Sequence, residues 1–249
     1  MLTVNHKLLI EVLGGSRSYG LATENSDTDY RGVFINTDTA HLLGLKKDEI
    51  LVSQVAEDKV FTEFRHALKL LRQANTQMIE LLFINNFINV SDEWEVVRRY
   101  RNCLIESSTL YKALKGYMQS ELRLANGERT GRLGSKRKDS IDKFGFSPKN
   151  FTQLLRLAWA GKYYFDYNVF PVNVQEYDYD FRNFLLNIKV NPHEYTKEQL
   201  NNYVKEAEQQ LEVSFSRRSI DNHFNEEIAN NLCHYVYSPF IKNLCPPKI

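Results

Sequence analysis

The stretch from Gly14 to Asp29 constrains the fold of this chain most, because it joins two short apolar runs through a turn of small residues. The two runs, Leu8 to Leu13 and Tyr30 to Ile35, have the length and composition of buried β-strands. Gly14 and Gly15 allow a positive φ and a close approach of the backbone to a ligand. The pattern therefore predicts two strands of one sheet, joined by a compact loop that could hold an anion.

Asp27 and Asp29 stand one residue apart where the second predicted strand begins. Because side chains alternate between the faces of a strand, both carboxylates are expected on one face. Two like charges held together need a cation, and Mg²⁺ prefers carboxylate oxygens, with waters and substrate phosphates as its other ligands. A helix beginning near Ser16 would direct free N–H groups toward an anion. Together these features predict a site for a nucleoside triphosphate and a metal ion.

A third carboxylate is expected to orient the attacking group. Asp58 opens the predicted strand from Lys59 to Thr62, which could lie beside the strand of Asp29. Glu63 is the rival, and a separation of five residues puts the two acids on opposite strand faces. We favour Asp58, because Glu63 begins the following helix, where the helix dipole already favours an acid. A solvent-exposed turn is an equal alternative for Asp58.

Three basic residues are candidates for phosphate contact. Arg17 lies inside the turn, where its guanidinium could pair with phosphate oxygens or remain a surface charge. Lys149 and Arg156 are seven residues apart, nearly two turns along one face of a predicted helix, and could reach toward a triphosphate. The alternatives are an ion pair at the core edge for Arg156 and a first-turn surface position for Lys149.

The pattern resembles the signature of the DNA polymerase β-like nucleotidyltransferase superfamily, in which Gly-Ser, a short helix and Asp-x-Asp recur in that order. The matching residues are Gly15, Ser16, Gly20, Ser26, Asp27 and Asp29. Two further segments, Asn75 to Phe83 and Phe144 to Leu157, extend the resemblance to a bacterial and phage branch of predicted nucleotidyltransferases associated with RNA ligases or RNA repair. The chain departs from that branch at Gln153, where a histidine is usual.

The resemblance implies metal-dependent transfer of a nucleoside monophosphate from an NTP to a hydroxyl acceptor, RNA among the candidates, with release of pyrophosphate. It implies Mg²⁺ or Mn²⁺ held by Asp27, Asp29 and Asp58. The implied nucleotide-binding residues are Gly15, Ser16, Arg17, Ser26, Lys149 and Arg156.

Two other functions stay open: a catalytically inactive nucleotide- or RNA-binding module, and a nucleotidyltransferase that modifies proteins. A structure with neither Asp58 nor Glu63 near Asp27 and Asp29 would favour binding alone.

Strand-like patterns early in the chain and helical periodicity afterwards predict an α/β (α+β) fold. We expect a small mixed-sheet nucleotidyltransferase domain at residues 1–90 and a mostly helical domain at residues 91–249 that closes the cleft. The strongest helices are expected at Ser107 to Leu124 and Lys149 to Asp166, and Thr196 opens a capping box. The stretch from Asn126 to Gly145 between them is expected to be a mobile connection.

Composition narrows the class of protein. The formal charge of +1 over 249 residues gives no global attraction to nucleic acid, so any RNA contact must come from a local patch. Cys103, Cys233 and Cys245 are too widely spaced for a disulfide framework or a zinc site. The chain begins with no signal segment and contains no apolar run of about 18 residues, which predicts a cytoplasmic protein without a membrane partner. The oligomeric state is left open.

Overall fold

The computed structural model describes residues 2, 5–46, 50–53, 58–128 and 135–241. The chain divides into two compact units, one of Met1–Glu106 with Asn222–Ile249 and one of Ser107–Asp221. It therefore passes from one unit to the other twice. The domain boundary expected after residue 90 stays a prediction.

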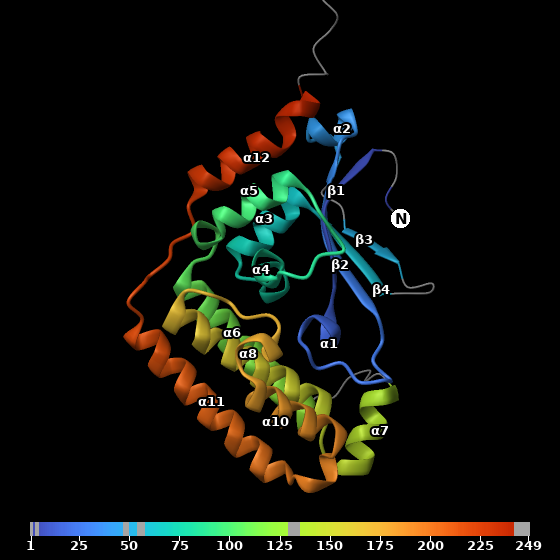
Figure 1. Cartoon of the computed structure of the whole chain (residues 1–249), viewed down its shortest axis with the longest axis vertical. Coiled ribbons are helices and arrows are strands. Elements are labelled where there is room, and N and C mark those ends of the chain that lie inside the picture. Colours follow the sequence, from blue (N-terminus) through green and yellow to red (C-terminus); the bar gives the residue numbers. More distant parts are fainter. Residues whose placement is uncertain (1, 3–4, 47–49, 54–57, 129–134, 242–249) are drawn as a thin grey trace, which may run out of the picture. The chain divides into compact units, whose positions relative to one another are not determined.

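A five-stranded sheet forms one layer of the first unit, with the strand order β3-β4-β2-β1-β5 (Figure 1). The strands are β1 (His6–Leu13), β2 (Asp29–Asn36), β3 (Ile50–Ser53), β4 (Asp58–Glu63) and β5 (Asn89–Val90). β2 pairs antiparallel with β1 and parallel with β4, so the sheet is mixed. The mixed α/β class predicted from the sequence is confirmed.

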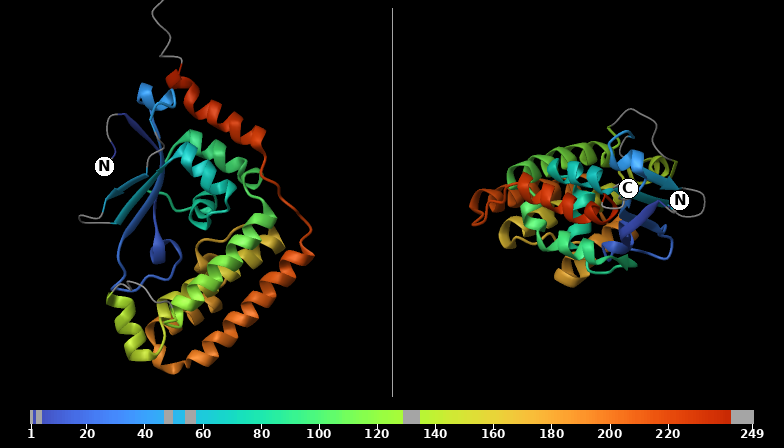
Figure 2. Two further views of the ribbon diagram at one scale, coloured as in Figure 1. Left: turned by 180° about the vertical axis from the view of Figure 1, so that it is seen from behind. Right: turned by 90° about the horizontal axis from the view of Figure 1, so that it is seen from above.

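Helices lie on one side of this sheet, as both side views show (Figures 1 and 2). They are α3 (Phe64–Arg72), α4 (Thr76–Phe83) and α5 (Asp92–Arg99), followed by the 3₁₀ helix η1 (Arg101–Leu104). Two helices of a single turn, α1 (Gly15–Ser18) and α2 (Thr39–Leu42), follow β1 and β2. The apolar side chains of β1, β2 and the three longer helices form the core of the unit.

Side-chain caps explain where two of these helices begin. Asn75 precedes α4, and its side-chain oxygen accepts a hydrogen bond from the amide of Met78 at 3.2 Å. Ser91 caps α5 through the amide of Trp94 at the same distance. Such caps satisfy backbone N–H groups that a helix cannot pair internally. The sequence predicts both helix starts, with Asn75 or Thr76 as the first cap and Ser91, ahead of Asp92 and Glu93, as the second.

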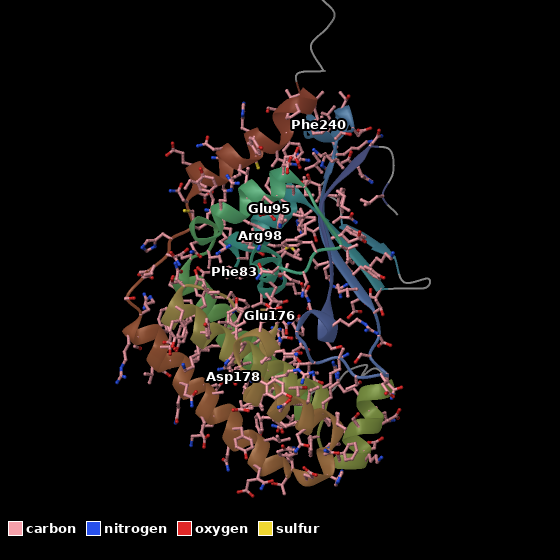
Figure 3. All side chains as sticks on the ribbon, viewed as in Figure 1. Phe83, Glu95, Arg98, Glu176, Asp178 and Phe240 are labelled. Carbon is pink, nitrogen blue, oxygen red and sulfur yellow. The ribbon has the colours of Figure 1, made fainter. Side chains whose placement is uncertain are left out.

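The last helix, α12 (Glu226–Ile241), returns to the first unit. Arg72 pairs with Glu226 at 2.7 Å, and Tyr237 donates a hydrogen bond to Glu63. Phe240, near the end of α12 (Figure 3), lies under the ammonium of Lys7, 5.8 Å from the ring centroid. A segment distant in sequence thus completes the core of the sheet unit.

The second unit contains no strand among its described residues, which form helices and short turns. It contains α6 (Ser107–Ala125), α7 (Ser135–Phe144), α8 (Pro148–Tyr167), α9 (Val174–Tyr177), α10 (Tyr179–Val190), the 3₁₀ helix η2 (Pro192–Glu194) and α11 (Lys197–Arg217). α8 is central and packs against α6, α10 and α11. The capping box predicted at Thr196 is present, with Gln199 as its partner.

Two segments of this unit differ from the sequence-based expectation. The expected connection from Asn126 to Gly145 contains α7, where Arg137 donates to the buried amide oxygen of Asn150 at 3.1 Å. Residues 129–134 of that connection lie outside the described residues. The sequence from Phe170 through the tyrosine-rich Tyr177 to Phe181 predicts an extended segment, but α9 and α10 form there, and Asp178 caps α10 through the amide of Phe181 at 2.9 Å. Capping here outweighs the strand preference of tyrosine.

Among the helices in the described parts of the chain, none combines the length and the apolar character needed to cross a membrane.

Candidate functional site

Two acids stand side by side where β2 and β4 begin. Parallel pairing sets Asp29 directly opposite Asp58. Neighbours in register on adjacent strands project from the same face of a sheet, so both carboxylates lie on one face. Arg31 lies two residues along β2 on that face, and its Nη2 is 4.0 Å from Oδ2 of Asp58. The parallel register thus brings two carboxylates and a guanidinium together.

The turn after β1 lies against Asp29. The amide of Gly14 donates to the carbonyl oxygen of Asp29 at 2.8 Å. Gly15 has a φ of +59°, and a Cβ built there would lie 2.2 Å from Oδ2 of Asp29. The backbone therefore passes directly over the carboxylate, which only glycine permits. Gly14 has a φ of −102°, so of the two glycines only Gly15 uses the positive φ that the sequence allows for both.

Hydrogen bonds brace the loop between α1 and β2. The carbonyl oxygen of Ser16 accepts from the amide of Leu21 at 2.9 Å. Arg17 is exposed and donates from Nη2 to the carbonyl oxygen of Ser26 at 3.1 Å. Oγ of Ser26 accepts from the amide of Thr23 at 2.8 Å. These residues hold the shape of the loop, and their contact with a nucleotide stays a prediction.

Asp27 lies in the loop two residues before β2 and is exposed. Because β2 begins at Asp29, strand alternation does not fix the direction of the Asp27 side chain. Within the part of the chain that the structure describes, no three His, Cys, Asp or Glu side chains gather closely enough to form a metal site. The structure thus pairs Asp29 with Asp58, while the role of Asp27 as a metal ligand stays a prediction.

Glu63 occupies a different environment from Asp58. It is fully buried and caps α3, where its carboxylate accepts from the amide of Arg65 at 3.0 Å. Its Oε1 also accepts from the phenol of Tyr237 and lies 3.6 Å from Nε2 of His41. Asp58 and Glu63 begin and end β4, roughly 17 Å apart at about 3.3 Å per residue. Glu63 is therefore a structural cap and not a neighbour of Asp29.

Lys149 and Arg156 belong to the second unit. Lys149 is exposed in the first turn of α8, whereas Arg156 is only 1% exposed within the same helix. The pKa of Lys189 on α10 is lowered, mainly by burial and to a smaller extent by the positive charge of Lys149. Gln153, at the position of the usual histidine, donates to the phenol of Tyr117. The contact of Lys149 and Arg156 with a triphosphate stays a prediction.

Comparison with known protein families identifies the relatives of this chain. The family model RlaP, described as the RNA repair pathway DNA polymerase beta family, matches residues 3–234. The chain belongs to this family. The match confirms the resemblance to polymerase β-like nucleotidyltransferases that the sequence carries around Gly15 and Asp29. No curated protein matches the chain.

Members of the wider polymerase β-like superfamily usually use divalent metal ions. The residues of this chain fit such an ion. Asp29 and Asp58 supply hard oxygen donors on one face, and Mg²⁺ is commonly held by one or two carboxylates together with substrate phosphates. The Asp58 side chain is 43% exposed, so a ligand can approach it from solvent.

The hydrogen bond between Tyr19 and Glu80 was not predicted from the sequence. The phenol of Tyr19, at the end of α1, donates to Oε2 of Glu80 on α4 at 2.9 Å. The apolar stripe of Met78, Leu81 and Leu82 predicts Glu80 on the exposed face of its helix, and this prediction is wrong, since Glu80 is only 8% exposed. Every residue of α4 from Met78 to Phe83 is buried, so the helix has no exposed face there. A single acid inside an apolar run was the available signal.

A second set of polar groups surrounds Glu63. Nη2 of Arg65 lies 2.6 Å from Nε2 of His41, on α2. Burial first, and then the charge of Glu63, raise the pKa of Cys233 on α12 to about 11, while Arg65 opposes the shift. The same two causes raise the pKa of Tyr237. This buried cluster joins α12 to the carboxyl end of β4 and is remote from Asp58.

Proposed function

We propose that this chain transfers a nucleoside monophosphate from an NTP to a hydroxyl group of RNA and releases pyrophosphate. The observation that carries the proposal is the pairing of Asp29 with Asp58 beneath the Gly15 turn, in a member of a polymerase β-like family. In this reaction the acceptor oxygen bonds to the α-phosphorus as the bond to the bridging oxygen of pyrophosphate breaks. The acceptor hydroxyl loses its proton to a carboxylate or to water.

The protein contributes position and charge in this proposal. Asp27, Asp29 and Asp58 would hold Mg²⁺ or Mn²⁺, which neutralises negative charge on the phosphates. Asp58 would also help to deprotonate the acceptor hydroxyl. Holding reactants in line and placing fixed charges where charge develops are the usual sources of catalysis in such transfers.

Nucleotide contacts are assigned to the loop and to α8. The backbone at Gly15 and Ser16 would hold the terminal phosphates, since the turn passes over the carboxylate of Asp29. Arg17, with Ser26 bracing the loop, would add positive charge. The proposal includes Lys149 and Arg156 as further phosphate ligands. RNA as the acceptor is supported by the description of the family as part of RNA repair.

A second candidate is a nucleotide- or RNA-binding module that does not transfer. Two observations favour it. The described residues hold no cluster of three potential metal ligands, and the guanidinium of Arg31 already approaches Asp58 at 4.0 Å. Against it stands the direct pairing of Asp58 with Asp29, which places a further carboxylate beside the Asp-x-Asp sequence.

One experiment distinguishes these functions. The chain is incubated with NTPs labelled at the α-phosphate and with Mg²⁺ or Mn²⁺, with total RNA in one reaction and cell protein in another. Label in RNA supports the proposal, and label in protein indicates a protein-modifying nucleotidyltransferase. Measurable nucleotide binding without label in either pool supports the binding module.

Asp29→Asn and Asp58→Asn should each lower the rate of label transfer on the order of a hundredfold or more, because each removes a charged ligand from the site. The fold should survive, since removing one of two adjacent like charges relieves repulsion. Asp92→Asn, at an exposed position in the first turn of α5, is the matched control and should transfer at the normal rate. Full transfer by both site variants would contradict the assignment.

A further inference from the structure

The hydrogen bond from Tyr19 to Glu80 has a consequence for the candidate site. We propose that Tyr19 and Glu80 are positioning residues, which fix the Gly15–Ser18 turn over Asp29 and so set the space for the triphosphate. The inference rests on the proposed function of this site. It gives a structural role to the Tyr19 phenol and the nearly buried Glu80 carboxylate, neither of which takes part in the transfer chemistry.

The amide of Gly14 ties the start of the turn to β2, and the far end of the turn needs a further anchor. α1 is a single helical turn, and none of its four side chains is buried. Apolar packing therefore contributes little to its position. Tyr19 follows directly as the residue that caps α1, and its phenol reaches α4 across 61 positions of sequence. This bond fastens the exposed turn to a helix in the core.

α4 can serve as that anchor because its own position does not depend on Glu80. Asn75 caps its first turn, and apolar side chains from Met78 to Phe83 bury the helix. A carboxylate among them is costly to bury unless it is hydrogen-bonded. Loss of the Tyr19 bond should lower stability and release the turn, while the cap and the apolar side chains keep α4 in place.

A short series of contacts leads from Tyr19 to Asp29. The amide of Tyr19 and Oγ of Ser18 both donate to the carbonyl oxygen of Gly15, at 3.3 and 2.9 Å. The α-carbon of Gly15 in turn faces the carboxylate of Asp29, so closely that a Cβ would lie 2.2 Å from it. A shift of Tyr19 is thus passed to the close contact between the turn and the carboxylate, beside which the phosphates would bind.

Nucleotide affinity, measured by calorimetry with Mg²⁺ and a non-hydrolysable NTP on the full chain, tests the inference. Tyr19→Phe and Glu80→Leu should each weaken affinity about tenfold, the size of one lost hydrogen bond to a charged group. The double variant should be no worse than either single one, since both remove the same bond. Glu80→Gln keeps an acceptor for the phenol and should restore most of the affinity. In transfer assays the same variants should raise KM more than they lower kcat.

Tyr237→Phe is the matched control, because it removes a phenol–carboxylate bond to Glu63 in the same unit but far along β4 from Asp58. It should lower the melting temperature and leave nucleotide affinity unchanged. If Tyr19→Phe and Glu80→Leu bind like the wild type, the inference is wrong while the proposed function stands. The inference also fails if Tyr237→Phe weakens affinity as much as they do. If the wild type neither binds nor transfers a nucleotide, the proposed function and the inference fail together.

Discussion

At the scale of single residues, Gly15 combines two demands that only glycine meets. Its φ of +59° lies in the left-handed region, and its α-carbon faces Oδ2 of Asp29. Gly15→Ala should cost about 1–2 kcal/mol for the backbone alone and should also push the turn away from the carboxylate. We expect a lower melting temperature and a transfer rate reduced on the order of tenfold, as for other displaced reacting groups.

Gly44→Ala separates these two effects. Gly44 has a φ of +75°, but nothing lies within 4 Å of a Cβ built there. The variant should therefore show a similar backbone cost with normal transfer. Equal loss of transfer in the two variants would show that the contact of Gly15 with Asp29 does not matter.

Local sequence pattern predicted where these residues lie in the turn and strand better than it predicted what surrounds them. Gly15 and Asp29 were recognisable from local spacing, because both belong to one turn and the strand after it. The placement of Asp58 beside Asp29 needed the parallel register of β2 and β4, which local pattern only suggested. The burial of Glu80 depends on packing around the whole of α4, which the apolar period of a single helix does not reveal.

At the scale of elements, α12 carries a thiol whose ionisation reports on its packing. Burial, and then the charge of Glu63, raise the pKa of Cys233 from 9.0 to about 11. In a chain with Cys103 and Cys245 replaced by Ser, alkylation of Cys233 should follow a titration with a midpoint near that raised value. Glu63→Gln should lower the midpoint only in part, because burial is the larger cause. A midpoint near 9 in the folded protein would show that α12 does not bury the thiol.

The same pKa shift predicts how stability changes with pH. Below about pH 9 the thiol is protonated in the folded and the unfolded chain, so its contribution is intact. As the pH rises from 9 toward 11, the unfolded thiol ionises first and the free energy of unfolding falls. Cys233→Ala should remove this part of the decline, which denaturant unfolding at several pH values would measure.

Elements with strong local signals, the caps at Asn75, Ser91 and Thr196 among them, were predicted well, and the helices of the tyrosine-rich stretch were not. The apolar runs of β1 and β2 and the capping box of α11 read directly from the sequence. The sequence predicts an extended segment through Tyr177 to Phe181, where tyrosines favour strands, and leaves Asn183 to Val190 as a helix or a strand. The caps at Asn173 and Asp178 outweigh that preference, and Phe181 of α10 packs against Trp159 of α8 with ring centroids 5.5 Å apart.

At the scale of the whole molecule, the first unit is built from two separate stretches of chain. The sequence predicts a sheet domain at residues 1–90 and shows no local sign that α12 packs with it. Pairing between segments so far apart leaves no local pattern, because each helix of such a pair shows only its own apolar face. The interlocked contacts between Tyr237 and Glu63, and between Arg72 and Glu226, appear only in the folded structure.

A chain truncated after Asp221 tests whether α12 is needed to complete the first unit. It loses the buried side chains of α12, Ala229, Leu232, Val236 and Tyr237. At about 1.5–3 kcal/mol for each large apolar side chain, the loss approaches the total stability of an ordinary domain, about 5–15 kcal/mol. It also leaves the buried carboxylate of Glu63 without its phenol donor. We expect amide hydrogen exchange to lose protection in α3 and β4.

The helices of the second unit provide the internal control for this truncation. α6, α8 and α11 pack on one another within Ser107–Asp221, so their amides should stay protected. Protection that persists in α3 and β4 would mean that α12 is dispensable and that residues 1–106 fold by themselves. Protection lost evenly over both units would mean that the two units unfold as one. Only selective loss in α3 and β4 fits a sheet unit that α12 completes, and that result would explain why Glu63, at the far end of β4 from Asp58, is buried among groups of α2 and α12.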